Sequence, residues 1–320
     1  MLLRSTVQLL RFHFSLFLLP VFLFAISQIP VVNWRITFFV FFVLHLLVYP
    51  ASNGYNSYMD RDETPIGGLK KPMQPTRQLF RISLLMDVIA LVISLIISKV
   101  LALGILFYII ASRAYSYRSI RLKQYPVIGF LTVFIFQGAV IFFIVYYACS
   151  ANKPAVAPII PCFVSSLLIG ALYPLTQIYQ HEADKKDGVI TISYILGKRG
   201  SFILSGLLFI SATALLYYYF VAIHQQNNFF FFLIFTAPVV LFFCYWMLGV
   251  WRNTAAANFK NSLIMNVVAM LCTSGCFKMK FSTCCMTASE RSCVAPGGSC
   301  TFTMMLPWSS AGRNELGRRM

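Results

Sequence analysis

Long uncharged apolar runs recur along most of this 320-residue chain, each close to the length of a membrane-spanning helix. The hydrocarbon core of a bilayer is about 30 Å thick, so a helix needs roughly 20 apolar residues to cross it. Hydrophobic residues make up 59% of the chain and charged residues only 11%, too few to cover a soluble globule. The sequence therefore predicts an all-α, multi-pass membrane helix bundle of about nine transmembrane helices. The expected spans are residues 12–32, 34–52, 82–98, 100–116, 126–149, 157–176, 202–223, 229–249 and 262–277.

The last of these runs marks a change in the character of the chain. It is only about 16 residues long before Lys278, which is short for a span. Beyond it, Ser, Thr, Gly, Cys and Met replace the Phe, Leu and Ile of the earlier runs. We therefore expect a transmembrane domain at residues 1–277 and an atypical, disordered C-terminal tail at residues 278–320.

The net charge of +17 reflects membrane topology rather than a nucleic-acid partner. Fifteen Lys and Arg residues lie in the loops that follow spans two, four, six and eight, whereas the opposite loops hold only Arg35, Lys99 and Lys153. Basic loops stay on the cytoplasmic side of a membrane. We expect an integral protein of a bacterial inner membrane or an organelle membrane, in contact with membrane lipids and with no nucleic acid. Its basic loops then face the cytoplasm or the equivalent organelle side.

Acidic residues are scarce, and their placement is the most informative feature of the chain. Six of the nine fall in two clusters, one after span two and one after span six. The clusters share a spacing, Asn56-x-x-x-Asp60-x-x-Glu63 against Gln180-x-x-x-Asp184-x-x-Asp187. If each helix continues through its cluster, positions i, i+4 and i+7 lie on one face. Each helix then presents an amide and two carboxylates together.

Both clusters are expected on the same side of the membrane, because spans two and six are an even number of crossings apart. Carboxylate and amide oxygens are ligands that suit Mg²⁺, and Lys and Arg in the same loops suit phosphate. The pattern predicts a metal–diphosphate site, although solvated loop ends would also be acidic and basic. The predicted metal ligands are Asn56, Asp60, Glu63, Gln180, Asp184 and Asp187.

At these residues the chain resembles the UbiA superfamily of intramembrane prenyltransferases, whose members carry an Asn/Asp-rich motif after helix two and a DxxxD-type motif after helix six. The resemblance covers residues 10–275 and departs from the family pattern at Thr64 and Gln180, where family members usually have carboxylates. The matching segments are Asn56-x-x-x-Asp60-x-Asp62, Lys70-Lys71-Pro72, Tyr115-Ser116, Arg121-Leu-Lys123, Gly129, Asp184-x-x-x-Gly188 and Leu196-Gly197.

The resemblance implies nine helices around a central cavity and a Mg²⁺-dependent transferase. The enzyme would move a prenyl group from an isoprenoid diphosphate to a lipophilic or aromatic acceptor within the membrane. Asp60 and Asp184 would be the catalytic metal ligands. The residues expected to hold the diphosphate or close over it are Lys70, Lys71, Tyr115, Arg121 and Lys123.

Two other classes of function stay open from the sequence. A transporter would use the acids as a cation pathway, although transport sites usually lie near the bilayer midplane. A non-catalytic relative would bind isoprenoid lipid without turnover, a reading motivated by Thr64 and Gln180. Asp87, within span three, is either a functional ionisable group or a residue near the membrane interface.

Overall fold

The computed structural model describes residues 2–154, 156 and 158–292. Within this part of the chain all regular structure is helical, and the only β-bridges are isolated ones. The first half contains α1 Arg4–Leu10, α2 Phe12–Ser15, η1 Leu16–Leu18, α3 Leu19–Ser27, α4 Trp34–Phe41, η2 Phe42–Val48, α5 Tyr49–Asp60, α6 Arg77–Ile97, α7 Lys99–Ser116 and η3 Leu122–Gln124. The second half contains α8 Pro126–Val133, η4 Phe134–Val140, α9 Ile141–Cys149, α10 Ile159–Gln177, α11 His181–Lys186, α12 Ile192–Ala222, α13 Gln226–Arg252, η5 Thr254–Ala256 and α14 Phe259–Ser292.

Eight helical stretches in the described part of the chain are long and apolar enough to cross a membrane. They overlap the first eight predicted spans, although individual ends differ, by as much as 10 residues where the seventh begins at Ile192 and not at residue 202. Their bounds are Arg4–Ser27, Trp34–Asp60, Arg77–Ile97, Lys99–Ser116, Pro126–Cys149, Ile159–Gln177, Ile192–Ala222 and Gln226–Arg252. The predicted ninth span lies within α14, which is not one of the eight.

The chain divides into two units, Met1–Phe281 and Ser282–Met320, and the site described below belongs to the first. Helix α14 continues past the predicted domain boundary at residue 277 and ends at Ser292. The rest of the predicted tail, residues 293–320, lies outside the described residues. Disorder of the tail therefore stays a prediction.

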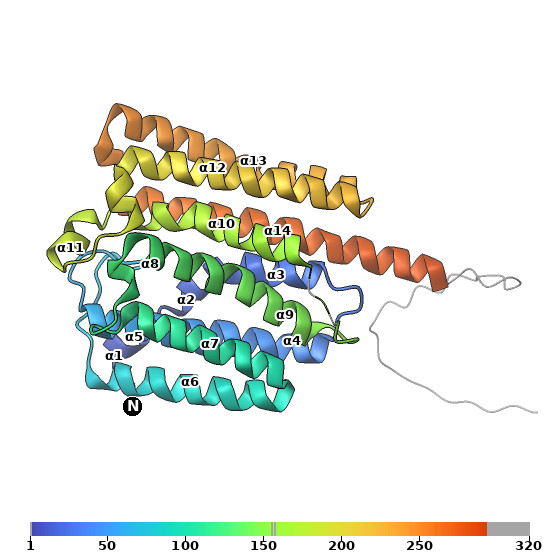
Figure 1. The fold of residues 1–320 in the computed structure, drawn as a ribbon, viewed down its shortest axis with the longest axis horizontal. Coiled ribbons are helices and arrows are strands. Elements are labelled where there is room, and N and C mark those ends of the chain that lie inside the picture. The colour runs from blue at the N-terminus through green and yellow to red at the C-terminus, as the bar shows by residue number, and fades with distance from the viewer. Residues whose placement is uncertain (1, 155, 157, 293–320) are drawn as a thin grey trace, which may run out of the picture. The chain divides into compact units, whose positions relative to one another are not determined.

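Consecutive helices pack as neighbours in the first unit. Helix α6 packs against both α5 and α7, α10 packs along α12, and α12 pairs with α13 (Figure 1). The largest cluster of buried apolar side chains takes residues from all eight spans, with Phe24, Tyr49 and Phe142 among its fully buried aromatics. Many large apolar residues remain exposed, such as Ile96 and Leu241, as expected for helices that face lipid.

Two spans are interrupted by π-helical turns near their own middle, η2 in the second and η4 in the fifth. Pro50 explains the first, because proline has no N–H to bond the carbonyl four residues earlier. The preceding amide, that of Tyr49, bonds the carbonyl of Leu44 five residues back. Such turns are frequent at functional sites. Phe136 and Gln137 of η4 line the cavity described below, as does Tyr49, the residue that follows η2.

The second π-turn depends on a close approach between η4 and α10. A Cβ built on Gly138 would lie 2.4 Å from the Cα of Ser166, closer than real contacts allow. The Ser166 hydroxyl accepts a hydrogen bond from the Ala139 amide at 2.9 Å, so this amide in the π-turn has a partner on α10. Small residues allow helices to pack this closely in membranes.

Replacing Gly138 with alanine is expected to destabilise the protein by about 1–3 kcal/mol, because the new methyl group forces the two backbones apart. The midpoint of denaturant or thermal unfolding in detergent measures this effect. Gly206→Ala is the matched control, since its nearest neighbour would lie 3.8 Å from the added Cβ. Equal stability of the two variants would show that η4 and α10 do not need this contact.

Candidate active site

The first acidic cluster lies at the end of α5, and the helix stops inside it. Arg61 adopts a left-handed conformation with φ 55°, so α5 ends at Asp60. The expectation that the helix continues to Glu63 is therefore wrong, and Glu63 is exposed instead of sharing a face with Asn56 and Asp60. The turn after α5 places Asp62, and not Glu63, in the wall of the cavity.

The second acidic cluster is also broken, because α10 ends at Gln177 and a separate short helix, α11, begins at His181. Gln180 is the residue before α11, and its carbonyl accepts from the Asp184 amide at 2.8 Å. Gln180 and Asp184 therefore share one face as predicted and both line the cavity. Asp187 is the C-cap residue of α11 and does not line the cavity.

The loop between α7 and α8 joins the two clusters. The Lys123 ammonium lies 2.5 Å from an Asp60 carboxylate oxygen. The guanidinium of Arg121 pairs with the carboxylate of Asp187, donates to the Asp187 carbonyl at 2.9 Å and lies 3.6 Å from Asp60. The two acidic segments are thus brought together at one end of the helices, where Figure 1 shows α11 beside the loops that follow α5 and α7.

A cavity of about 250 Å³ opens between these segments and continues between the helices. Its wall is polar near the acids and apolar deeper in the bundle. The polar lining includes Asn56, Asp60, Asp62, Lys123, Gln180 and Asp184, and the deeper lining includes Tyr49, Tyr108, Val133 and Phe136.

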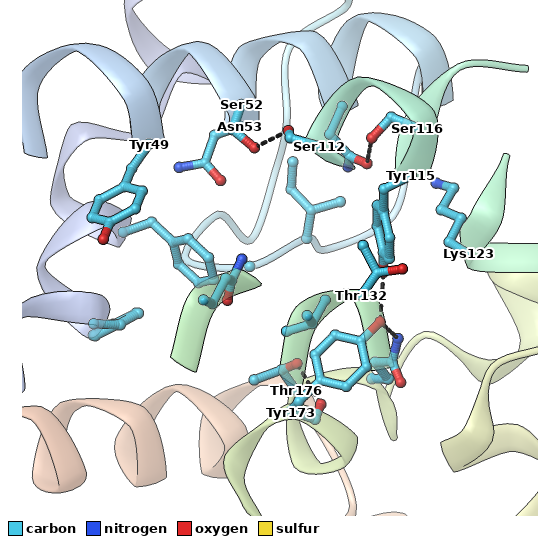
Figure 2. A pocket seen from close by; sticks show the side chains of 18 of the residues that line it. Tyr49, Ser52, Asn53, Ser112, Tyr115, Ser116, Lys123, Thr132, Tyr173 and Thr176 are labelled. Atoms are coloured by element: carbon cyan, nitrogen blue, oxygen red, sulfur yellow. Dashed lines mark hydrogen bonds between the residues drawn. The ribbon is translucent and has the colours of Figure 1, made fainter. Parts of the chain in front are cut away.

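Hydrogen bonds between helices hold the side chains around this cavity. The hydroxyls of Tyr115 on α7 and Tyr173 on α10 lie 2.5 Å apart, and the Gln177 amide donates to Tyr173 at 2.9 Å (Figure 2). On the opposite wall, Ser52 of α5 and Ser112 of α7 are bonded at 2.6 Å, as Figure 2 also shows. The side chains of α5, α7 and α10 are therefore fixed relative to one another before any ligand binds.

Lys70 and Lys71 are not brought to this cavity. Both are exposed, and neither lines it. Their segment is held against α1, because Gln8 donates to the Lys71 carbonyl at 3.3 Å and accepts from the Met73 amide at 2.9 Å. A role for these two lysines in holding the diphosphate thus receives no support from their position.

Arg11 lies in the cavity wall and was not among the predicted site residues. It is 5% exposed, has a left-handed backbone with φ 47°, and donates to the carbonyls of Gly67 and Asn53 at 3.2 Å each. The sequence showed a basic residue beside the first apolar run, which is also what flanks any span. Only the three-dimensional fold shows that Arg11 is a cavity residue and not simply a basic residue at the end of a span.

Burial and mutual repulsion perturb the carboxylates outside the spans. Burial, together with the nearby charge of Asp60, raises the pKa of Asp62 to about 6. Burial raises the pKa of Asp184 to about 7; Lys123 opposes this shift, and the carboxylates of Asp62 and Asp60 add to it. Three carboxylates, those of Asp60, Asp62 and Asp184, line the cavity with only two cationic side chains among its described residues, Arg11 and Lys123, and a bound cation would stabilise the charged form of the carboxylates.

Oxygen ligands for a divalent cation are available at this cavity, but protein side chains alone do not complete a site. In the described part of the chain, no group of three or more His, Cys, Asp and Glu residues is arranged to hold an ion. Mg²⁺ is commonly held by one or two carboxylates together with substrate phosphates and water. Asp60, Asp62 and Asp184 fit an ion that arrives with a diphosphate.

The family model for the UbiA prenyltransferase family matches residues 16–268 of this chain. The match covers well over half of the sequence, so the chain belongs to the UbiA prenyltransferase family. The resemblance inferred from the motifs and the predicted class of enzyme are both confirmed. The chain is accordingly an integral, multi-pass membrane protein. No curated protein is similar enough to match the chain.

Solved structures of similar fold include a UbiA homologue from Aeropyrum pernix K1, 17% identical, with a TM-score of 0.64 over 85% of this chain and 99% of that one. A UbiA homologue from Archaeoglobus fulgidus bound to GPP and Mg²⁺ is 18% identical, with a TM-score of 0.59 over 86% and 99%. A digeranylgeranylglyceryl phosphate synthase is 21% identical, with a TM-score of 0.54 over 86% and 98%. At these identities the similarity shows the fold, and the predicted fold class is confirmed.

Proposed function

We propose that this chain transfers a prenyl group from an isoprenoid diphosphate, bound with Mg²⁺, to a lipophilic acceptor inside the membrane. The observation that carries the proposal is the meeting of Asp60, Asp62 and Asp184 at the mouth of one cavity whose deeper wall is apolar. Such a cavity suits a molecule with an anionic head and a hydrocarbon tail. The similar Archaeoglobus fulgidus homologue bound to GPP and Mg²⁺ supports this choice of donor.

The basic side chains at the mouth suit the diphosphate head. Lys123 now neutralises Asp60, and a Mg²⁺ ion on that carboxylate would release the ammonium to a phosphate oxygen. Arg11, in the wall beside Asp62, offers a second cation to the head group. When bound, Mg²⁺ supplies charge stabilisation for the diphosphate as the bond to the prenyl carbon breaks.

The deeper wall suits protection of the reactive prenyl group. A prenyl cation reacts with water unless the site excludes it, and the deeper wall is formed mainly by apolar and aromatic side chains, with Ser15 and Gln137 also in it. The rings of Tyr115 and Tyr173, held by their shared hydrogen bond, lie where an aromatic face stabilises a developing positive charge.

The two departures from the family pattern have a structural counterpart. Thr64 is exposed, and Asp62 is the neighbouring carboxylate that lines the cavity. Gln180 donates to the Pro65 carbonyl at 3.2 Å, which ties the second acidic segment to the loop after the first. An ionised carboxylate could not donate this hydrogen bond. We infer that Gln180 holds the two segments together, at a position where family members usually have a carboxylate.

The transfer assay separates this function from its alternatives. Purified protein in detergent or nanodiscs receives labelled geranyl diphosphate, Mg²⁺ and a panel of lipophilic and aromatic acceptors. Prenylated product and released diphosphate are expected with Mg²⁺ and are expected to disappear with EDTA. Tight binding of the donor without product on any acceptor would indicate a non-catalytic relative, and no binding at all would favour a transporter.

We also propose that the acidic segments face the cytoplasm or the equivalent side, as the positive-inside rule predicts for the loops that carry them. Arg118, Arg121 and Lys123 all lie in the loop that joins the two acidic segments. Labelling of an exposed cysteine introduced by Glu63→Cys in sealed vesicles of known orientation tests the side. Labelling from the opposite face would refute it.

A further inference from the structure

A second cavity, of about 590 Å³, lies between the helices beside the first, and it is partly open because Ile210 and Tyr217 in its lining are exposed. It is bounded by residues of α3, α10, α12, α13 and α14, and its described lining contains no Asp, Glu, Lys, Arg or His. Figure 1 shows α10, α12 and α13 as neighbours in this part of the first unit. The volume is in the range of cavities that bind small lipophilic ligands. The reaction step described so far leaves it without a role.

The second cavity adjoins the first. Phe17, Ile169 and Leu172 line both. Two of them belong to α10, where Leu172 lies one turn before Thr176, which lines only the first cavity. With a rise of 1.5 Å per residue, the junction is within about two helical turns of the acidic end of α10. The two cavities therefore meet close to the place where the donor would react.

The second cavity is elongated along the membrane-spanning helices. Its lining on α12 runs from Ser205 to Tyr217, a rise of about 18 Å. The Ser205 hydroxyl is 2% exposed and has no hydrogen-bond partner among the described residues. A long apolar channel with a buried hydroxyl in its wall fits an amphiphile with one hydrocarbon tail, since the hydroxyl gives a polar group a partner.

The chemistry of the transfer assigns the two cavities to two substrates. The reacting carbon of the donor is bonded directly to its diphosphate, so it stays near Asp60 and Asp184. The acceptor must reach that carbon from within the membrane, and the second cavity adjoins the first near that end of α10. We propose that the acceptor is a single-tailed lipid whose tail occupies the second cavity and whose nucleophilic end lies at the junction. This rests on the proposed function and deepens it.

In the transfer, the bond between the prenyl carbon and the diphosphate oxygen breaks, and its electron pair leaves with the diphosphate. An electron pair of the acceptor forms the new bond to that carbon. The acceptor loses one proton, which departs with the diphosphate. The hydrocarbon tail takes no part in the chemistry and serves to hold the nucleophile in place.

The test uses tritiated hexadecanol, a neutral single-tailed probe, with the purified full chain in a scintillation-proximity binding assay. Saturable binding is expected. Gly206→Phe, which projects a ring into the second cavity, is expected to weaken binding by about tenfold or more. Leu207→Phe is the matched control, because Leu207 is 59% exposed and lines neither cavity. Its affinity is expected to stay within about twofold of wild type.

Competition identifies which substrate uses the cavity. Geranylgeranyl diphosphate with Mg²⁺ has a tail long enough to enter, yet it is expected to leave hexadecanol bound. Displacement would assign the cavity to the donor tail and overturn the proposal. So would non-saturable binding, or equal affinity of Gly206→Phe and Leu207→Phe. Binding of labelled geranyl diphosphate in parallel separates the cases, because loss of donor binding in wild type contradicts the proposed function itself.

Discussion

Replacing Asp184 with asparagine is expected to lower prenyl transfer on the order of 100-fold or more while the protein stays folded in the membrane. The carboxylate lines the cavity opposite Asp60, and the substitution keeps the shape of the side chain but removes its charge. The Mg²⁺ ion that would accompany the diphosphate then has one carboxylate ligand fewer, and the charge that develops on the diphosphate is less well stabilised. Initial rates of wild type and variant at the same donor concentration, with and without added Mg²⁺, measure the loss.

Glu182→Gln is the matched control for this variant. Glu182 lies on the same short helix, α11, but is exposed and outside the cavity. It is expected to keep nearly all of the wild-type rate. A wild-type rate for Asp184→Asn, or an equal loss for the two variants, would mean that the second acidic segment does not act on the substrate through Asp184.

Replacing Arg113 with leucine is expected to destabilise the protein by about 3–5 kcal/mol, because it leaves a buried carboxylate unpaired. Arg113 on α7 pairs with Asp87 on α6, and both side chains are largely buried within their spans. Arg113 also lies 4.0 Å from the centre of the Tyr55 ring on α5. One guanidinium thus connects three neighbouring spans.

The double variant Asp87→Leu/Arg113→Leu tests this reason. When both charges are replaced by apolar side chains, no group is left unpaired, and most of the lost stability is expected to return. Unfolding midpoints in detergent for the wild type, both single variants and the double variant form the cycle. A double variant no more stable than Arg113→Leu would show that the packing of the guanidinium, and not the unpaired charge, dominates.

The sequence was sufficient to predict the helical spans and the convergence of the two acidic segments. Apolar runs of membrane length leave the chain few alternatives. An even number of crossings between Asp60 and Asp184 places both at one end, and the structure joins their segments through Arg121 and Lys123. These features follow from the composition of the chain and the order of its spans. They can be predicted without knowing the conformation of any side chain.

The side-chain details could not be predicted in the same way. Asp62 lines the cavity instead of Glu63 because Arg61 adopts a left-handed conformation, a local choice that no pattern in the sequence announces. Asp187 turns away from the cavity to pair with Arg121. Periodicity along a helix describes a face only as far as the helix continues, and both helices stop early.

The basic residues show the same limit. Lys70 and Lys71 follow the first motif closely in sequence but are held away from the cavity by contacts with α1. Arg11, distant from both motifs in sequence, lies in the cavity wall beside them. Proximity to a motif along the chain is therefore a poor guide to which cations reach the substrate, since loop paths depend on tertiary contacts.

Equilibrium binding of labelled geranyl diphosphate to the purified protein, in Mg²⁺ and in EDTA, tests most directly whether the two acidic segments grip one diphosphate together. Wild type is expected to bind the donor only with the divalent cation, and Asp60→Asn and Asp184→Asn are each expected to lose that binding. Metal-independent binding, or full binding by either variant, would contradict a shared site.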